Sequence, residues 1–289
     1  MKEVSIIIPA FNEAKTIGEV IETLQEICEG SEIIVVNDGS TDATGQVAKD
    51  AGALVYNHPY NIGNGAAIKT GIRIASGEVL VLMDGDGQHK PEDVMRLLEY
   101  FPEFDMVVGA RDGGSQASKG RAFGNWVYNK MASYVTKFKI KDLTSGFRAV
   151  KSDIARQFVY LLPNTYSYPT TLTLSVLRSG RSLKYVSIVT EKRKDGKSQI
   201  KFFTDGIKFF LIITKICTLY SPLRIFLPVS FMLFFIGVGY YAYTFFAMGR
   251  FTNMSALLFS TSVIIFMMGL VSEQICQMRF ERSEGDNLT

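Results

Sequence analysis

The chain has 289 residues, of which 47% are apolar and 20% are charged. This composition excludes an intrinsically disordered chain and supplies enough apolar residues for a packed core. The net charge of +3 is too small to indicate a nucleic-acid partner, so we expect none.

Short apolar runs alternate with helical patterns over the first 110 residues. The expected strands are 4–8, 32–36, 53–56, 79–83 and 105–109. The expected helices are 14–28, 42–51, 63–75 and 91–100. Continuous apolar strands that alternate with helices predict an α/β fold, a doubly wound parallel sheet covered on both faces. We expect Pro9 to end the first strand, and ligands to bind at the carboxyl ends of the strands.

Two carboxylates, Asp84 and Asp86, directly follow the fourth expected strand, and Gln88 adds an amide oxygen. Hard divalent cations such as Mg²⁺ or Mn²⁺ take oxygen ligands and often keep substrate phosphates in their coordination shell. The spacing therefore predicts a metal site, although an Asp-x-Asp pair also occurs in solvated turns. His89 comes next, and we interpret it as structural or solvent-facing.

Two more features mark the same edge of the expected sheet. Asp38 ends the second strand, where a carboxylate either holds a base or ribose or caps the next helix. A Gly-rich loop with Asn61, Gly63, Gly65 and Lys69 leads into a helix and is typical of a phosphate-approach loop. It is neither a Walker loop nor the dinucleotide fingerprint.

Charged residues are absent from two stretches near the C-terminus, 225–249 with 25 positions and 251–272 with 22 positions. Each is long enough to cross a hydrocarbon core of about 30 Å as a helix. With a tight turn at 249–253, they predict a transmembrane hairpin; the alternative is a pair of buried core helices. Basic residues flank the hairpin at its open end, which predicts that both termini lie in the cytosol. Three distant cysteines, which suggest no disulfide framework, agree with a reducing compartment.

Residues 199–220 combine a narrow stripe of lysines with large apolar side chains. This pattern favours a helix in the membrane interface over an ordinary amphipathic helix. The expected organisation is a cytosolic catalytic domain at 1–198, interfacial helices at 199–222, a hairpin at 223–280 with spans at about 225–248 and 252–274, and a cytosolic tail at 281–289.

Four motifs of this chain resemble those of family 2 glycosyltransferases with a GT-A fold. They are Pro9–Glu13, Val36–Asp42, Asp84–His89 and Thr144–Phe147. More narrowly, the chain resembles the polyprenyl-phosphate glycosyltransferases, the group of dolichyl-phosphate mannose synthase. The resemblance covers nearly the whole chain, and the C-terminal hairpin resembles that of the two-span members.

The resemblance implies a multi-pass membrane enzyme that moves a sugar from a UDP- or GDP-sugar to a polyprenyl phosphate, with Mg²⁺ or Mn²⁺ as cofactor. The expected nucleotide-sugar contacts are Pro9, Phe11, Asn12, Glu13, Val36, Asp38, Lys69, Asp84 and Gly85. The expected metal ligands are Asp86 and Gln88, and the expected catalytic residues are Asp84, Arg111 and Arg121. The expected acceptor-phosphate residues are Arg111, Arg121, Arg193, Lys197 and Ser198. A phosphate nucleophile needs no strong base, and direct displacement would invert the anomeric centre.

Two alternatives stay open beside this function. A processive polysaccharide synthase would carry a Gln-x-x-Arg-Trp motif, whereas the single tryptophan, Trp126, follows Gly124 and Asn125. A non-catalytic membrane adaptor on a transferase fold is disfavoured by the intact acidic and basic motifs. We interpret Trp126 as a core or interface packing residue. The sequence does not determine the donor base, the sugar, the polyprenol or whether the protein is a homo-oligomer.

Overall fold

The computed structural model describes residues 4–111, 119–165, 167–189 and 221–285. The chain divides into two compact units, unit 1 (Met1–Lys201) and unit 2 (Phe202–Thr289). The expected interfacial helices at 199–220 lie outside the described residues, as do Arg193, Lys197 and Ser198.

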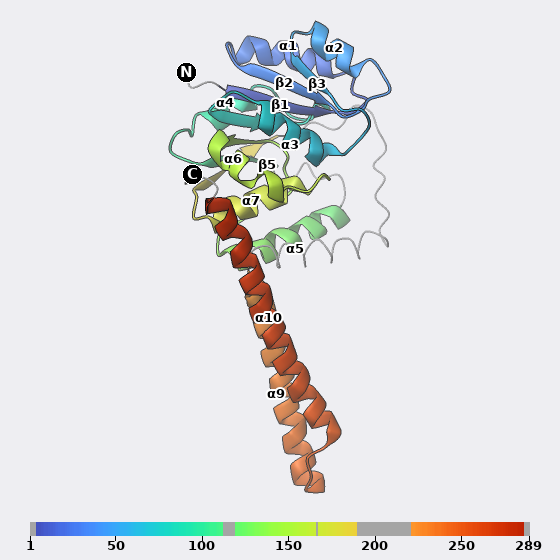
Figure 1. The fold of residues 1–289 in the computed structure, drawn as a ribbon, viewed down its shortest axis with the longest axis vertical. Helices are drawn as coiled ribbons and strands as arrows, with labels where there is room; N and C mark the ends of the chain where they lie inside the picture. The colour runs from blue at the N-terminus through green and yellow to red at the C-terminus, as the bar shows by residue number, and fades with distance from the viewer. Residues whose placement is uncertain (1–3, 112–118, 166, 190–220, 286–289) are drawn as a thin grey trace. The chain divides into compact units, whose positions relative to one another are not determined.

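Unit 1 is a seven-stranded sheet between layers of helices (Figure 1). Its strands are β1 (Val4–Ala10), β2 (Glu32–Asn37), β3 (Leu54–Asn57), β4 (Val79–Leu82), β5 (Met106–Arg111), β6 (Arg148–Lys151) and β7 (Leu183–Ile188). Its helices are α1 (Ile17–Ile27), α2 (Thr44–Asp50), α3 (Asn64–Ile74), α4 (Asp93–Leu98), α5 (Lys119–Thr136), α6 (Ser152–Phe158), the 3-10 helix η1 (Val159–Leu161) and α7 (Tyr168–Arg178).

The doubly wound α/β fold is confirmed, and the predicted strands β1 to β5 all run in one direction, but the sheet is mixed because it also contains a strand, β6, that the sequence analysis did not predict. The strand order is β3-β2-β1-β4-β6-β5-β7. Strands β1 to β4 run parallel, but β6 is antiparallel to both β4 and β5. Strand β6 has only four residues, and no predicted helix precedes it. Its direction therefore follows from its pairing with β4 and β5, which are distant in the sequence.

Strand β1 also continues through Pro9, which the sequence analysis expected to end it. Pro9 pairs with Val36 of β2, while the ladder between β1 and β4 ends at Ile7 and Leu82. Ala10 accepts a hydrogen bond from the N–H of Asp38 on the β2 side. Because neighbouring residues of a strand bond to opposite sides, Pro9 faces the side where the ladder has ended, and its missing N–H costs no hydrogen bond.

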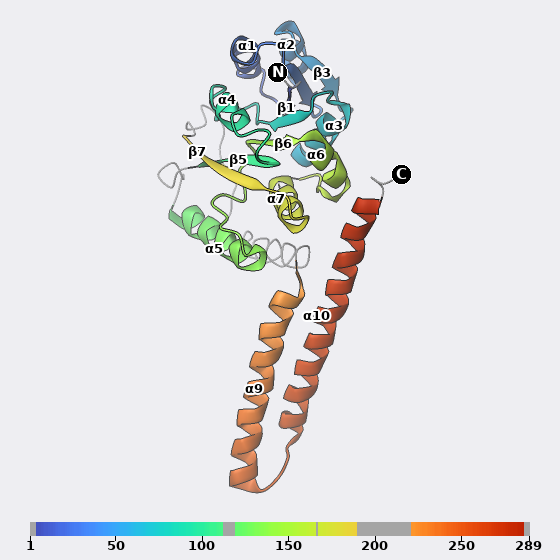
Figure 2. The same cartoon turned by 90° about the vertical axis from the view of Figure 1, so that its left-hand side faces the viewer.

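Helices cover both faces of the sheet (Figures 1 and 2). One face packs against α1, α2 and α4, through side chains such as Ile17, Leu24 and Leu97. The other face is covered by α3, α6 and α7, with Ile68 and Ile72 of α3 fully buried. This packing fixes the strands and brings the carboxyl ends of β1, β2 and β4 together at one edge.

Unit 2 contains two long helices, α9 (Leu223–Met248) and α10 (Asn253–Gly285). They pack as a hairpin: the hydroxyl of Ser230 donates to the Ser262 carbonyl, and that of Ser262 donates to the Ser230 carbonyl, each at 2.9 Å. Gly249, with φ of +63°, ends α9. Both helices are long and apolar enough to cross a membrane, and only 11% and 17% of their apolar stretches are buried. This exposure disfavours the alternative of two core helices.

Candidate active site

The carboxyl ends of β1, β2 and β4 open into a cleft of about 360 Å³. The residues that line it are Pro9, Ala10, Phe11, Glu13, Asp38, Asn61, Gly63, Asn64, Asp84, Gly85, Asp86 and Thr165. Six of the nine expected nucleotide-sugar contacts are among them, together with the expected metal ligand Asp86. The sequence analysis missed Asn64 and Thr165; Thr165 belongs to a loop that no local pattern connects with the cleft.

Asn12 lies beside the cleft and joins two of the motifs. Its backbone φ is +57°, a conformation that Asn tolerates better than most residues. Its side-chain oxygen accepts a hydrogen bond from the N–H of Thr41 at 2.9 Å, and its own N–H donates to the hydroxyl of Ser40 at 3.0 Å. Glu13 donates its N–H to the Thr44 hydroxyl at 2.9 Å. These bonds hold the loop that presents Phe11 and Glu13 to the cleft.

The Asp38 carboxylate is only 3% exposed and makes three hydrogen bonds. Oδ1 lies 2.7 Å from Nδ1 of His58 and accepts the N–H of Ile62 at 3.0 Å, while Oδ2 accepts the N–H of Gly63 at 2.8 Å. Asp38 thereby holds the Gly-rich loop before α3 against the end of β2. A carboxylate offers about four acceptor positions, which leaves one at Oδ2 for a ligand in the cleft.

Asp84 and Asp86 stand on a tight turn. The Thr16 hydroxyl donates to the carbonyl of Gly85 at 3.1 Å, and Oδ1 of Asp86 accepts the N–H of Gln88 at 3.1 Å. A Cβ added at Gly146 would lie 2.9 Å from Oδ2 of Asp84. The loop before β6 therefore packs directly on the Asp84 carboxylate, and glycine makes this approach possible.

The carboxylate oxygens of this cleft suit a divalent cation that takes its remaining ligands from a substrate. Among the described residues, no group of three or more His, Cys, Asp or Glu side chains could hold a metal ion alone. Asp84 and Asp86 nevertheless line one cleft, and carboxylate and phosphate oxygens together are what Mg²⁺ and Mn²⁺ prefer. Gln88 is not among the residues that line the cleft, and its described contact with Asp86 is through the backbone.

Arg111, at the end of β5, is held by an aspartate that the sequence analysis did not single out. Its Nε lies 2.8 Å from Oδ2 of Asp142 and its Nη2 lies 3.0 Å from Oδ1, while Nη2 also donates to the Thr144 hydroxyl at 2.6 Å. Burial opposes the charge of Arg111, but the hydrogen bonds and charge of Asp142 and the charge of Asp84 raise its pKa. Among the described residues, no hydrogen bond involves Nη1 of Arg111.

Val36 and Lys69, two of the expected site residues, do not line the cleft. Val36 is fully buried in β2 and does not line the cleft. Lys69 donates to the Leu162 carbonyl at 3.2 Å and to the Asn164 side chain, so its ammonium group holds the loop after η1. Arg121 belongs to α5, but its side chain lies outside the described part of the structure.

Two buried basic side chains lie behind the site. His89 stacks on Phe147, with ring centroids 5.0 Å apart, and burial lowers its pKa to about 4, so it is neutral at pH 7. Arg148 is fully buried and donates to the carbonyl of Pro169 at 2.8 Å, to the Thr173 hydroxyl at 3.0 Å and to the carbonyl of Ser145. Arg148 thus fixes the loop that covers Asp84.

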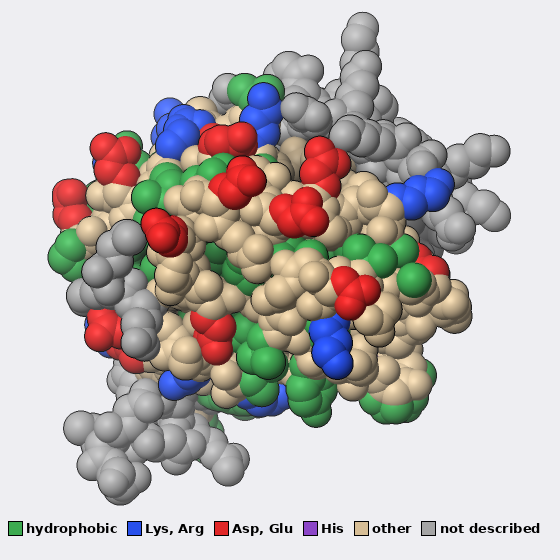
Figure 3. Space-filling model, turned by 90° about the horizontal axis from the view of Figure 1, so that it is seen from above, with side chains coloured by type: hydrophobic (Ala, Val, Ile, Leu, Met, Phe, Trp, Pro, Cys, Tyr) green, Lys and Arg blue, Asp and Glu red, His purple; other side chains and the backbone are tan. Residues whose placement is uncertain are grey.

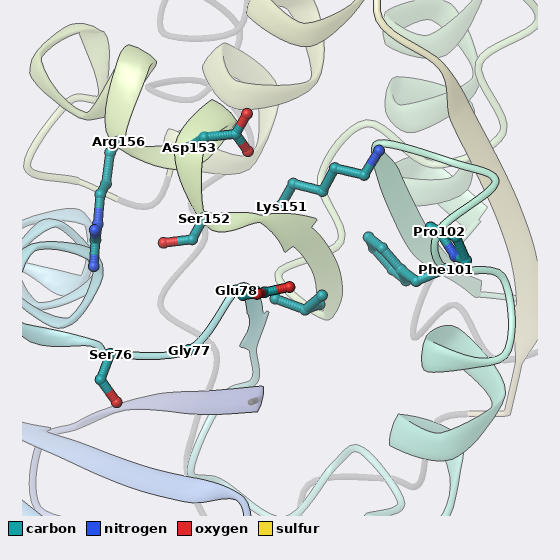
Figure 4. Close-up of a pocket in the computed structure, with 10 residues that line it drawn as sticks. Ser76, Gly77, Glu78, Phe101, Pro102, Lys151, Ser152, Asp153 and Arg156 are labelled. Carbon is teal, nitrogen blue, oxygen red and sulfur yellow. The ribbon is translucent and has the colours of Figure 1, made fainter. Parts of the chain in front are cut away.

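A second cavity, of about 400 Å³, lies at the opposite ends of the strands (Figure 4). Its lining combines Lys151 and Arg156 with Glu78 and Asp153. Lys151 already pairs with Asp105 at 2.7 Å. None of the residues singled out from the sequence lines this cavity, so the site motifs point to the cleft at the carboxyl ends.

The fold and the cleft define an α/β protein whose carboxylate-lined site lies at the carboxyl ends of its strands, and comparison with known proteins identifies the family. Residues 5–158 match the model of glycosyl transferase family 2, and residues 221–278 match that of the GtrB C-terminal hairpin. The first match covers more than half of the chain, which therefore belongs to glycosyl transferase family 2.

Three similar proteins illustrate the relationship. An uncharacterised protein of Methanocaldococcus jannaschii is 32% identical over 74% of this chain and 93% of its own. An undecaprenyl-phosphate mannosyltransferase of Micrococcus luteus is 29% identical over 67% of this chain and 86% of its own. The crystal structure of glucosyl-3-phosphoglycerate synthase from Mycobacterium tuberculosis in complex with Mn²⁺, UDP and phosphoglyceric acid has a TM-score of 0.59 and 20% identity, over 75% of this chain and 78% of that one. This structural similarity shows that unit 1 and the mycobacterial synthase share a fold.

Proposed function

We propose that this glycosyltransferase moves a sugar from a nucleotide-sugar to a polyprenyl phosphate, which yields a polyprenyl-phosphate-linked monosaccharide. The observation that carries the proposal is the pairing of a carboxylate-lined cleft with Arg111, whose charge interacts with Asp84. The relative in Micrococcus luteus is named an undecaprenyl-phosphate mannosyltransferase, and two helices that are apolar enough to cross a membrane suit a lipid acceptor.

The donor would occupy the cleft. Phe11 is 44% exposed there and offers an apolar surface to a base, while Asp38 has one acceptor position left. Asp84 and Asp86, with Gln88 as a candidate third ligand, would hold Mg²⁺ or Mn²⁺ against the diphosphate. When bound, the cation would neutralise negative charge on the departing nucleoside diphosphate. The mycobacterial synthase of the same fold was crystallised in complex with Mn²⁺ and UDP, which supports this part of the proposal.

The acceptor would need no general base from the protein. A phosphomonoester has its second pKa near 6 and is mostly dianionic at neutral pH, so its own oxygen is the nucleophile. That oxygen bonds to the anomeric carbon as the bond from this carbon to the diphosphate breaks, and the configuration inverts. Arg111 would hold the phosphate through Nη1, because Asp142 and Thr144 fix the rest of its guanidinium group.

The second arginine and the basic loop complete the proposed acceptor site. Arg121, Arg193, Lys197 and Ser198 would add contacts to the lipid phosphate. Residues 1–198 would form a cytosolic catalytic domain, with interfacial helices at 199–222 and the hairpin at 223–280 as the anchor. Both termini would lie in the cytosol, since the basic residues gather at the open end of the hairpin.

The test is a panel of UDP- and GDP-sugars offered to the purified full-length chain with a short polyprenyl phosphate and Mg²⁺ or Mn²⁺. Mass spectrometry should find one sugar added to the lipid phosphate, and NMR of the anomeric proton should show inversion. A long glycan product would instead favour the processive synthase. Absence of both transfer and donor hydrolysis with every sugar would favour the adaptor.

A further inference from the structure

Helix α5 is amphipathic, with buried side chains on its inner side and exposed ones on its outer side. Tyr128, Ala132 and Val135 are buried on its inner side, where the Tyr128 hydroxyl lies 3.0 Å from that of Thr170 on α7. Trp126 and Tyr134 are 55% and 62% exposed. Because Trp126, Lys130 and Tyr134 are spaced by four residues, they share the opposite side of the helix.

The segment that contains α5 is strongly basic. Residues 119–141 contain six Lys and Arg and no Asp or Glu, so this segment alone carries +6 in a chain whose net charge is +3. Lys130 lies over Trp126, with its Nζ 4.8 Å from the ring centroid. We define the α5 face by its exposed members, which are Trp126, Lys130, Tyr134, Lys137, Lys139 and Lys141.

The charge of unit 1 is unevenly distributed. In Figures 1 and 2, α5 lies on the opposite side of this unit from α1 and α2. Helix α1 exposes Glu19, Glu22 and Glu26. Figure 3, seen from the side of α1 and α2, shows acidic groups spread across that surface. Unit 1 therefore carries negative charge on the side of α1 and positive charge on the side of α5. This distribution would orient unit 1 with α5 toward a negatively charged surface.

We propose that the α5 face docks on the surface of an anionic lipid bilayer. Trp and Tyr are amphipathic rings that favour the level of the lipid headgroups. Lysines extend their charged ends toward lipid phosphates while their alkyl stems stay on apolar surface. A second copy of the chain fits this face poorly, because a two-fold contact would press lysines against lysines.

The position of α5 gives docking a consequence for the acceptor site. Oδ1 of Asn129 accepts the N–H of Leu143 at 3.1 Å, and its Nδ2 donates to the Lys141 carbonyl at 2.8 Å. These bonds tie α5 to the turn at Asp142, which holds Arg111. Docking would thus bring Arg111 near the headgroup layer, where the proposed acceptor phosphate lies. Only this consequence depends on the proposed function; lipid docking does not.

The test uses the fluorescence of Trp126, which is the only tryptophan of the chain. The full-length protein is placed in nanodiscs of phosphatidylcholine, with or without phosphatidylglycerol, and with lipids brominated on their acyl chains. We expect a blue-shifted emission and quenching by bromine in the anionic discs. Both effects should weaken in neutral discs and at high salt, since ions screen the lysines.

A charge reversal with a matched control completes the experiment. Lys139→Glu should lower the ratio of docked to undocked protein about tenfold or more, because each basic residue near the surface contributes roughly 1 kcal/mol. Lys49→Glu, the same charge reversal at an exposed residue of α2, should leave the ratio of docked to undocked protein unchanged. Trp126 emission typical of water in anionic discs, without quenching, would overturn the proposal. So would a blue shift that depends on protein concentration in detergent, which would assign the face to a second copy.

Discussion

Asp84 is the residue on which separate segments of the site converge. It follows β4, lines the cleft at the carboxyl ends of the strands, contributes to the raised pKa of Arg111 and lies under the loop at Gly146. Its neighbours come from parts of the chain more than 20 residues apart in sequence. Small shifts of this carboxylate should therefore affect catalysis more than stability.

Gly146→Ala tests this sensitivity. The added methyl group would meet Oδ2 of Asp84 at 2.9 Å and the hydroxyl of Tyr168 at 3.3 Å, and would displace the carboxylate. We expect kcat to fall about 10- to 100-fold, because displacements near 1 Å cost that much, while the unfolding temperature changes by a few degrees at most. Gly239→Ala, at a helical glycine with open space, is the control. Unchanged turnover of the Gly146 variant would contradict the role of this contact.

Asp86→Asn tests the candidate metal site. The substitution keeps the shape of the side chain but removes a negative charge from a cleft that would hold a diphosphate and a cation. We expect transfer to fall about 100-fold or more, as removal of one preorganised electrostatic contact often does. Initial rates at varied Mn²⁺ and Mg²⁺ measure the effect, with exposed Asp153→Asn as control. Near-normal turnover of Asp86→Asn, together with full activity in EDTA, is incompatible with this site.

At the scale of elements, the turn between α5 and β6 fixes the side chain of Arg111. Oδ1 of Asp142 accepts the N–H groups of Thr144 and Ser145, both at 3.1 Å, while the same carboxylate pairs with Arg111. Burial raises the pKa of Asp142, but the hydrogen bonds and charge of Arg111 outweigh burial and lower it. One side chain thus folds the turn and fixes the arginine that ends β5.

Asp142→Asn should therefore change both stability and its pH dependence. The folded pKa lies below the ordinary 3.8, so the stabilisation is complete above that pH and is lost as the pH falls through the folded value. We expect the variant to lose about 1–3 kcal/mol at neutral pH, and its stability to change less than that of the wild type between pH 5 and pH 3. Denaturant unfolding at several pH values measures this effect. If the free energies of unfolding of variant and wild type changed with pH in parallel, the pairing of Asp142 with Arg111 would not be the source of the stabilisation.

At the scale of the whole molecule, the proposed donor cleft and the apolar helices belong to different compact units. All residues that line the cleft precede residue 166, whereas α9 begins at Leu223. Unit 1 has its own continuous core, formed by α1, α2, α4 and the sheet. Donor binding should therefore not require the hairpin.

A chain truncated after Ser198 tests this separation. We expect it to fold and to bind nucleotide with Mn²⁺ or Mg²⁺, because the cleft lies wholly within unit 1. Transfer to a long polyprenyl phosphate in bilayers should fall strongly, since the anchor that presents the lipid is missing. Calorimetry with nucleotide and transfer assays in vesicles measure the two effects. A folded truncated chain that does not bind nucleotide would show that the separation is wrong.

The sequence by itself determined the features that depend on local pattern. Apolar runs placed β1 to β5, the charge-free stretches placed α9 and α10, and the Asp84–Asp86 pair marked the edge of the sheet where the cleft lies. Tertiary contacts were needed to show the antiparallel β6, the buried Arg148 and the pairing of Asp142 with Arg111 across 31 residues. They also showed that Trp126, which the sequence analysis assigned to core or interface packing, is 55% exposed and so does not belong to the core. The physical reason is that strand direction, burial and ion pairing depend on neighbours distant in the chain, which only the folded molecule brings into contact.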